Sequence, residues 1–124
     1  MTIANWCVLA AAALPFLWTA VAKFSGPGFN NRRPRDFQDK LEGWRKRAHW
    51  AQLNAFEAFP IFAAMVLIAQ QAGAAQGRVD QLALAFVGLR VAHGVCYIGD
   101  WHALRSLVWA LGMACAVAIF LSAA

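Results

Sequence analysis

Charged side chains are scarce in this sequence and absent from its two ends. Only 14% of the 124 residues are charged and 61% are hydrophobic, whereas about a quarter are charged in a typical soluble domain. Neither Met1–Ala22 nor Ser106–Ala124 contains a charged side chain. A chain of this length buries only about two-thirds of its surface in water, too little to hide so much apolar material. The scarcity of charge excludes an ordinary soluble domain and indicates a protein folded in lipid.

Patterns that carry metal, redox or hydrolytic chemistry are also missing. The three cysteines, Cys7, Cys96 and Cys115, lie in apolar stretches and form no CxxC or Cys/His spacing. We interpret them as small buried hydrophobic residues. No phosphate-binding loop and no Ser/His/Asp set is visible. We therefore predict no metal site, no redox-active cysteine pair, no phosphate-binding loop and no Ser/His/Asp catalytic site.

The basic residues are concentrated in one segment. Eight of the eleven Lys and Arg residues lie between Lys23 and Arg47, and the net charge is +5. Because this charge flanks apolar spans, it is typical of a cytoplasmic membrane loop rather than of a nucleic-acid surface. Each basic side chain there also attracts anionic lipid, by about 1 kcal/mol. We expect membrane lipid and no nucleic acid among the partners, and Arg35–Arg47 to form an interfacial start to the second span.

Four apolar segments are long enough to cross a bilayer as helices. The first covers about 30 Å at about 1.5 Å per residue, which matches the hydrocarbon core. Helices are expected because lipid-exposed backbone must satisfy its own hydrogen bonds, and no strand-like alternation is present. The sequence thus predicts an all-α integral membrane protein, a left-handed up-down four-helix bundle. The predicted spans are 3–22, 48–72, 81–99 and 104–122, the basic loop is 23–47, and all belong to one domain, 1–124.

The position of the basic loop also predicts the orientation. The positive-inside rule places this loop in the cytoplasm. Both termini and the second loop then face outward, and the third loop, with Asp100 and His102, faces the cytoplasm. We expect a multi-pass protein of the cell (inner) membrane.

Polar residues inside the second and third spans form two stripes at helical spacing. A charge at the centre of a bilayer costs at least about 2.5–3.5 kcal/mol, so it usually faces a partner or a cavity. The stripes therefore either line one cavity or pair with each other. Their members, each at i, i+3, i+7 and i+10, are Arg47, Trp50, Asn54 and Glu57, and Arg90, His93, Tyr97 and Asp100.

Two interpretations of these stripes stay open. In the first they form an internal clamp, in which Glu57 pairs with Arg90 and Asn54 bonds across helices without any ligand. In the second they line a pocket at the cytoplasmic end. Several cations and a phenol at one depth suit an anionic, partly polar small molecule and an apolar co-substrate dissolved in lipid. The residues expected at that depth are Arg47, Tyr97, Asp100 and Arg105.

A longer motif resembles a known family. The run Arg47-Ala-His-Trp-Ala-Gln-Leu-Asn-Ala-Phe-Glu-Ala-Phe-Pro60 resembles the second-helix signature of the MAPEG family, the membrane-associated proteins of eicosanoid and glutathione metabolism. Asn31-Arg-Arg-Pro-Arg35 and Leu41-Glu-Gly-Trp44 are similar to the first loop of its bacterial branch. Arg90, Tyr97 and the segment Leu104-Arg-Ser106 fit the family as well, so the likeness covers essentially the whole chain.

The resemblance implies a homotrimer that binds glutathione between neighbouring protomers near the cytoplasmic surface. It also implies that an arginine at the start of the fourth helix stabilises the thiolate, because a cation beside a thiol lowers the thiol's pKa. On this basis the expected catalytic residue is Arg105. The expected residues for binding glutathione, the co-substrate, are Arg47, Asn54, Glu57, Arg90, His93 and Tyr97.

The sequence departs from the eicosanoid enzymes of this family at several positions. Trp50 stands where those enzymes have an arginine, and Ala58 and His93 stand where they have tyrosines. The interval from Tyr97 to Arg105 is one residue longer. The favoured hypothesis is a glutathione-dependent transferase or peroxidase acting on lipophilic electrophiles or lipid hydroperoxides.

Whether the chain is an enzyme stays open, because the departures on the second helix favour a non-catalytic protein that binds a lipid or thiol ligand. A transporter subunit is disfavoured, since the spans are neither repeated nor broken by Gly and Pro.

Overall fold

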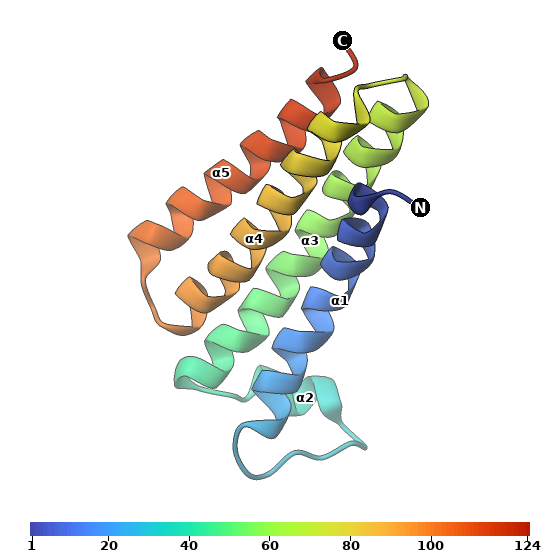
Figure 1. Ribbon diagram of the computed structural model, residues 1–124. Coiled ribbons are helices and arrows are strands. Elements are labelled where there is room, and N and C mark those ends of the chain that lie inside the picture. Colours follow the sequence, from blue (N-terminus) through green and yellow to red (C-terminus); the bar gives the residue numbers. More distant parts are fainter.

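Four long helices and one short helix make up the protein. The computed structural model describes all of residues 1–124. Each long helix is long and apolar enough to cross a membrane, and the helices run side by side as a bundle (Figure 1). The predicted all-α membrane four-helix bundle is thus confirmed. The helices are α1 (Ile3–Phe24), α2 (Pro34–Asp39), α3 (Gly43–Gln71), α4 (Gln76–Ile98) and α5 (His102–Leu121).

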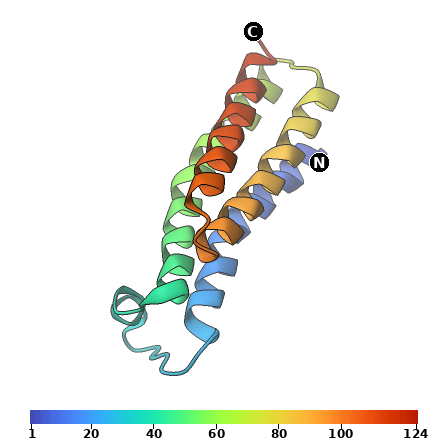
Figure 2. The same cartoon turned by 90° about the vertical axis from the view of Figure 1, so that its left-hand side faces the viewer.

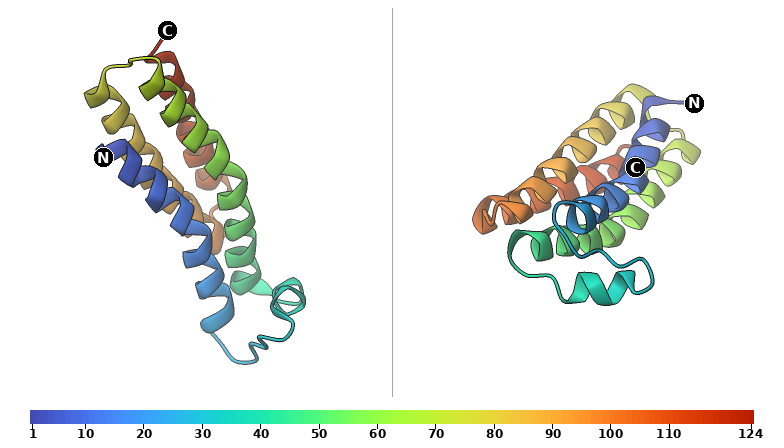
Figure 3. Two further views of the ribbon diagram at one scale, coloured as in Figure 1. Left: turned by 90° about the vertical axis from the view of Figure 1, so that its right-hand side faces the viewer. Right: turned by 90° about the horizontal axis from the view of Figure 1, so that it is seen from below.

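The middle of the bundle is formed by α3 and α4. Helix α1 packs against both of them on one side, and α5 packs against both on the other (Figures 1 and 2). The two chain termini lie at one end of the bundle, which we call the termini end. The short helix α2 and the turn between α4 and α5 lie at the opposite end, which we call the loop end (Figure 3).

Three of the long helices begin before the spans predicted for them. Helix α3 begins at Gly43 rather than at residue 48, α4 at Gln76 rather than at 81, and α5 at His102 rather than at 104. These first turns contain polar residues, so hydropathy does not mark them, although the helical backbone continues through them. Where each helix meets the lipid boundary stays a prediction.

Only the last part of the segment Arg35–Arg47 forms the predicted start of the second span, because α3 begins at Gly43 and the part before it belongs to a separate helix. Pro34 occupies the first turn of a separate six-residue helix, α2, a position that suits its fixed φ and missing N–H. The chain then leaves the helix at Lys40, and α3 begins at Gly43, whose φ of 63° lies in the left-handed region. The glycine therefore separates α2 from α3.

One arginine of α3 closes the end of α1. The Arg45 guanidinium donates to the carbonyl groups of Ala22 (3.1 Å), Lys23 (3.0 Å) and Pro27 (3.4 Å), and it lies over the Phe37 ring of α2. Ala22 and Lys23 lie in the last turn of α1, where carbonyls have no intrahelical partner, and Pro27 lies in the loop that follows. Arg45 therefore joins α1, the loop and α2 at one point.

Small residues dominate the contacts between helices. Ala4, Ala83 and Ala116 are among the fully buried positions, which lets the backbones approach closely, as in other membrane bundles. The closest approach is at Gly94 of α4, where an added Cβ would lie 2.0 Å from the indole of Trp18 of α1. Only 27 of the 124 residues are buried, and many large apolar side chains point outward, as expected for a surface that faces lipid.

A polar network joins three helices at the termini end. The Gln70 amide of α3 donates to Thr2 Oγ1 and Asn5 Oδ1, both at 2.9 Å, and lies 3.4 Å from Gln76 Oε1. Thr2 and Asn5 also form the capping box of α1. The Asp80 carboxylate of α4 accepts from the backbone N–H of Ala4 at 2.8 Å and from Gln76. The start of α1 is thereby tied to both α3 and α4.

Candidate functional site

A polar pocket lies between α3, α4 and α5, toward the loop end. Its volume is about 210 Å³. The side chains around it include two cationic or potentially cationic groups, a phenol, a hydroxyl and an amide. They are Asn54 of α3, His93 and Tyr97 of α4, and Arg105, Ser106 and Trp109 of α5. We call this the polar pocket.

Arg105 and Tyr97 meet at the junction of α4 and α5. The guanidinium carbon of Arg105 lies 4.5 Å from the centroid of the Tyr97 ring. The contact follows from a tight turn in which Asp100 adopts φ 61° and Trp101 caps α5, so that Arg105 falls in the first turn of that helix. The start of a helix carries partial positive charge. Arg105 adds a full charge there, which makes this wall of the pocket suited to an anion.

Arg90 supports the pocket from behind. It is only 3% exposed, and its Nη2 donates to Asn54 Oδ1 at 2.6 Å. Its Nη1 has no hydrogen-bond partner. The cross-helix bond expected of Asn54 therefore exists, and no ion pair joins Arg90 to Glu57. Of the two contacts of the predicted internal clamp, the cross-helix bond of Asn54 is present and the ion pair of Glu57 with Arg90 is absent.

Glu57 lies on the outer surface of α3. It is exposed and lines an apolar pocket of about 150 Å³ between α3 and α5. We call this the apolar pocket. It shares Asn54 and Trp109 with the polar pocket, and its other members are Glu57, Ala58, Ile61 and Met113.

His93 is buried in the wall of the polar pocket. Its side chain is 3% exposed, its Nδ1 has no hydrogen-bond partner, and its ring lies edge-on to Tyr97 with centroids 5.7 Å apart. Buried polar atoms in proteins are nearly always paired. An unpaired nitrogen beside a pocket is therefore a candidate contact for a bound molecule.

A second, wider hollow lies at the loop end, between the α2–α3 connection and the α4–α5 turn. Its volume is about 480 Å³, and we call it the loop-end cleft. The indole of Trp50 lines the cleft and lies with its centroid 6.4 Å from that of Tyr97, which lines the polar pocket. These two rings stand between the hollows. The cleft is lined by Leu41, Glu42, Gly43, Lys46, Arg47, Trp50 and Asp100.

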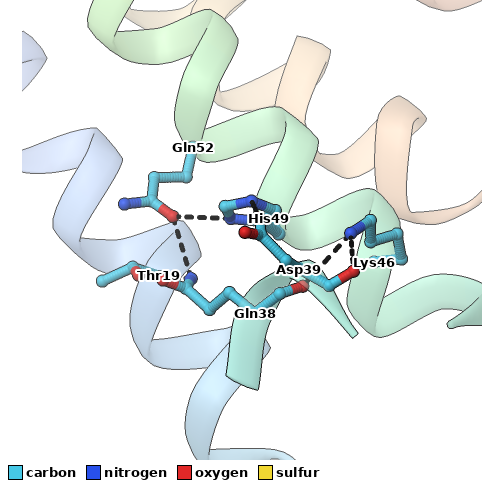
Figure 4. Close-up of polar contacts among 6 residues, drawn as sticks. All are labelled: Thr19, Gln38, Asp39, Lys46, His49 and Gln52. Carbon is cyan, nitrogen blue, oxygen red and sulfur yellow. Dashed lines mark hydrogen bonds and ion pairs between the residues drawn. The ribbon is translucent and has the colours of Figure 1, made fainter. Parts of the chain in front are cut away.

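The short helix α2 is held beside the cleft by a buried amide (Figure 4). Gln38 is 3% exposed, and its Nε2 donates to Thr19 Oγ1 of α1 at 2.8 Å and to Gln52 Oε1 of α3 at 2.9 Å. Lys46 donates to backbone carbonyls in the last turn of α2, and His49 contacts the same Gln52 oxygen at 3.2 Å. This network places the α2–α3 connection on the rim of the cleft.

The comparison with protein families is decisive for the identity of the fold. The MAPEG family model matches residues 3–124. The chain belongs to the MAPEG family. Membership supports a membrane function related to glutathione or eicosanoids in general terms. No curated protein and no solved structure matches the chain.

In this MAPEG chain the predicted site residues fall into four places. Asn54, His93, Tyr97 and Arg105 line the polar pocket together. Glu57 lines the apolar pocket beside it, and Arg90 lies behind Asn54. Arg47 lies in the loop-end cleft instead, where its Nε donates to the carbonyl of Ile98 at 3.0 Å. His49, next to Arg47 in the second-helix motif, belongs to the α2 network.

Sequence reasoning missed several residues of these hollows. Ser106 and Trp109 follow Arg105 by one and four positions on α5, so helical spacing from Arg105 would have indicated Trp109. Lys46 precedes Trp50 by four positions on α3, so helical spacing would have indicated it as well. Glu42 had no such signal, because the α2–α3 connection reaches the cleft only through tertiary contacts. No group of three or more His, Cys, Asp or Glu side chains in the protein is arranged to hold a metal ion.

Proposed function

We propose that this MAPEG protein is a membrane-embedded, glutathione-dependent transferase or peroxidase acting on lipophilic electrophiles or lipid hydroperoxides. The observation that supports it most is the polar pocket with the Arg105 guanidinium over the Tyr97 ring at 4.5 Å. In this proposal Arg105 stabilises the glutathione thiolate, because a cation beside a thiol lowers the thiol's pKa and raises the thiolate fraction near neutral pH. Asn54, His93 and Tyr97 bind the tripeptide.

The remaining predicted residues have supporting roles in this proposal. Arg90 holds Asn54 in place through its 2.6 Å hydrogen bond, and its Nη1 lies buried without a partner. Glu57 and Arg47 contact glutathione from the two hollows that flank the polar pocket. Ser106, next to Arg105, adds a hydroxyl that can donate to the sulfur or to the second substrate.

The apolar pocket suits the second substrate. It lies next to the polar pocket and is lined mainly by Ala58, Ile61, Trp109 and Met113 on the outer face of α3 and α5. A lipophilic molecule dissolved in the bilayer would reach it sideways, without passing through water. The thiolate would then attack from the polar side. Attack on an electrophilic carbon forms a thioether, with departure of a leaving group or protonation of the adduct. Attack on a hydroperoxide oxygen breaks the O–O bond and gives an alcohol and a glutathione sulfenic acid, which a second glutathione converts to the disulfide and water.

We further propose that the chain works as a homotrimer. Glu57 lies fourteen positions after Gly43, about 21 Å along α3 at about 1.5 Å per residue, and it is exposed and unpaired in the single chain. A lone carboxylate facing hydrocarbon is costly. A neighbouring protomer over α3 and α5 would cover it and complete the site.

The proposed setting is the inner membrane of a bacterium, and we assign the chain to the bacterial branch of the family. The first-loop segments Asn31–Arg35 and Leu41–Trp44 support this assignment. Most of the basic residues lie at the loop end, which supports a cytoplasmic position for α2 and the α4–α5 turn and an outer position for both termini.

A second candidate function is non-catalytic binding of a lipid or thiol. It is favoured by the second-helix departures from the eicosanoid enzymes. Ala58 is 4% exposed and offers no polar side chain to a ligand, and Trp50 faces the loop-end cleft instead of supplying a cation. Turnover separates the two candidates, because only the enzyme consumes an electrophile or a hydroperoxide.

The test is glutathione binding to the detergent-solubilised protein, measured by calorimetry together with thiolate absorbance. We expect saturable binding and a thiolate signal. Arg78 is an exposed arginine at the start of α4, so the control variant Arg78→Ala should keep both. Arg105→Ala should abolish the thiolate signal and lower turnover about hundredfold. Absence of binding at millimolar glutathione would rule the proposal out. Binding without turnover of any hydroperoxide or electrophile would favour the second candidate.

A further inference from the structure

One histidine of α3 lies between two oxygen atoms that come from different helices (Figure 4). His49 is buried, with 11% of its side chain exposed. Its Nδ1 lies 3.2 Å from Gln52 Oε1 on the same helix, and its Nε2 lies 3.7 Å from Asp39 Oδ1, on the last residue of α2. Gln52 presents its oxygen at this point, because the same atom accepts a hydrogen bond from Gln38 Nε2 at 2.9 Å.

The number of protons on the His49 ring decides how many of these contacts it satisfies. A neutral imidazole has one N–H and one nitrogen lone pair. With the proton on Nδ1, the lone pair of Nε2 faces the Asp39 carboxylate, and with the proton on Nε2, the lone pair of Nδ1 faces Gln52. The imidazolium presents an N–H to both oxygens. The surroundings of His49 therefore match its protonated form.

The other charged groups around His49 are engaged elsewhere. On α3, Arg45 and Lys46 are bonded to carbonyls of α1 and α2. Helix α1 carries a single charged side chain, Lys23, which lies over an aromatic ring of the loop. The remaining charged side chains of α2 are exposed, namely Arg35, Asp36 and Lys40. The acidic and basic groups of α4 and α5 at the loop end line the polar pocket, support it or lie in the α4–α5 turn, and they are Arg90, His93, Tyr97, Asp100, His102 and Arg105. Asp39 is thus the carboxylate with which His49 pairs.

The contact between His49 and Asp39 lies where α2 ends and the chain enters the rim of the loop-end cleft. Residues 41–43, which follow Asp39 closely, line that cleft. Gln38 and Lys46 also hold α2, but an amide and an ordinary ammonium keep their charge between about pH 5 and 8, whereas imidazole changes its charge in this range. Among the groups that hold α2, His49 is therefore the one able to respond to pH near neutrality.

We propose that His49 is a pH-dependent switch for the attachment of α2. Protonation of His49 adds the ion pair with Asp39, so the α2–α3 connection is held more tightly in mildly acidic than in alkaline solution. Because the attached state of α2 binds this proton better than the detached state, falling pH favours attachment. As the pH rises and the proton leaves, Gln38 and Lys46 hold α2 without the ion pair. The inference concerns α2 alone and does not depend on the proposed glutathione chemistry.

The test is hydrogen exchange of the α2 backbone amides in the detergent-solubilised protein, at about pH 5.5 and about pH 7.5, on either side of the imidazole transition. Division by the exchange rate of an unstructured peptide at the same pH gives the protection, which reports local opening. The amides of Phe37 and Lys40 bond to the carbonyls of Arg33 and Asp36. They should be about threefold better protected at the lower pH, a small factor because an ion pair with an exposed carboxylate contributes little.

Two variants remove the two partners separately. His49→Gln keeps an amide N–H for Gln52 and has no titratable group, and Asp39→Asn removes the carboxylate. In both, the ratio of protection at the two pH values should fall to about one. The histidine control is His102→Gln, exposed at the start of α5, and the carboxylate control is Asp36→Asn, on the exposed side of α2. Both controls should keep the threefold ratio.

Several results would overturn the inference. Equal protection of α2 at the two pH values in the unmodified chain, or better protection at the higher pH, would do so. A ratio that survives in His49→Gln would show that another group titrates, and a ratio that survives in Asp39→Asn would remove Asp39 as the partner. Amides in the middle of α3 should be equally protected in every variant. If His49→Gln lowers their protection, Asp39→Asn alone decides, because its side chain is 73% exposed and does not contribute to the core.

Discussion

The two ends of the bundle use polar side chains in opposite ways. At the termini end Gln70 donates to Thr2 and Asn5, and Asp80 accepts from the start of α1 and from Gln76, so these groups satisfy one another. Toward the loop end, polar groups of the two hollows lack partners within the chain. These are the ring nitrogen of His93, Nη1 of Arg90, and the carboxylates of Glu42 and Asp100.

This difference separates stability from function. Polar groups that satisfy one another stabilise the fold and leave no capacity for a ligand. Unsatisfied groups lower the stability of the empty protein, and such violations are expected where a molecule binds. The termini end therefore serves the fold, and we propose that ligand binding takes place toward the loop end, beside the networks of Arg45 and Gln38 that hold α2 there. Four substitutions test this division.

The largest effect is expected at the packing contact that holds α1 against α4. Gly94→Ala should lower the free energy of unfolding by about 3 kcal/mol, because the added Cβ would lie 2.0 Å from the Trp18 ring. The measurement is thermal denaturation in detergent. Gly88→Ala is the matched control, since nothing lies within 4 Å of its Cβ, and it should be neutral or stabilising. Equal behaviour of the two variants would show that close packing does not hold α1 in place.

A buried charge near the polar pocket should matter for binding and not for folding. Arg90→Met should weaken glutathione binding about tenfold, because Asn54 loses its partner and Nη1 is removed. Its melting temperature should stay equal or rise, since removal of a buried charge that has no acidic partner offsets the lost bond to Asn54. Calorimetry and denaturation on the same sample check both. A lower melting temperature with unchanged binding would reassign Arg90 to the structural part of the molecule.

The opposite pattern is expected at the termini end. Gln70→Leu should lower the free energy of unfolding by about 2 kcal/mol, because two bonds between α3 and α1 are lost and the Thr2 and Asn5 oxygens keep only their capping-box donors. Glutathione affinity should be unchanged. Gln71→Leu, the neighbouring exposed residue at the last position of α3, serves as the control for side-chain polarity. A loss of affinity in Gln70→Leu would contradict the division between the two ends.

The smallest effect is expected at the amide that holds α2. Gln38→Ala should cost about 1 kcal/mol and free α2 from α1 and α3, since both bonds of Gln38 Nε2 are lost. The readout is limited proteolysis within residues 25–42, which should become faster. Asp36→Asn, on the exposed side of α2, should leave the cleavage rate unchanged. Unchanged cleavage in Gln38→Ala would show that Arg45 and Lys46 hold the loop by themselves.

The parts of the molecule that depend on periodicity could be predicted from the sequence. The four long helices follow from hydropathy, and Asn54, His93, Tyr97 and Arg105 share one pocket because helical spacing puts the first three on facing stripes. The cross-helix bond of Asn54 was also predicted, although its partner, Arg90, was expected to pair with Glu57 instead. The spatial neighbours of these residues are determined by their positions along a regular helix, which the sequence shows.

The parts that depend on how irregular segments pack could not be predicted. Hydropathy does not show that Gln38 is buried between Thr19 and Gln52. Without knowledge of this contact, the sequence of α2 suggests a basic extension of α3. Glu42 and Asp100 are far apart in the sequence, and neither lies in the part of a polar stripe that was predicted to span the membrane. They come together at the cleft only because the tertiary fold brings the α2–α3 connection next to the α4–α5 turn. The expected pair of Glu57 and Arg90 does not form, because Glu57 faces outward.

The capping of α1 by Arg45 has a consequence for how the protein is made. The carbonyls of Ala22 and Lys23 receive their hydrogen bonds from a residue of the next long helix, so the first span has an incomplete end until α3 begins to form. During synthesis these two helices should therefore mature in the membrane as a helical hairpin rather than one after the other. A chain released from the ribosome before Arg45 would hold an unfinished first span, exposed to membrane proteases.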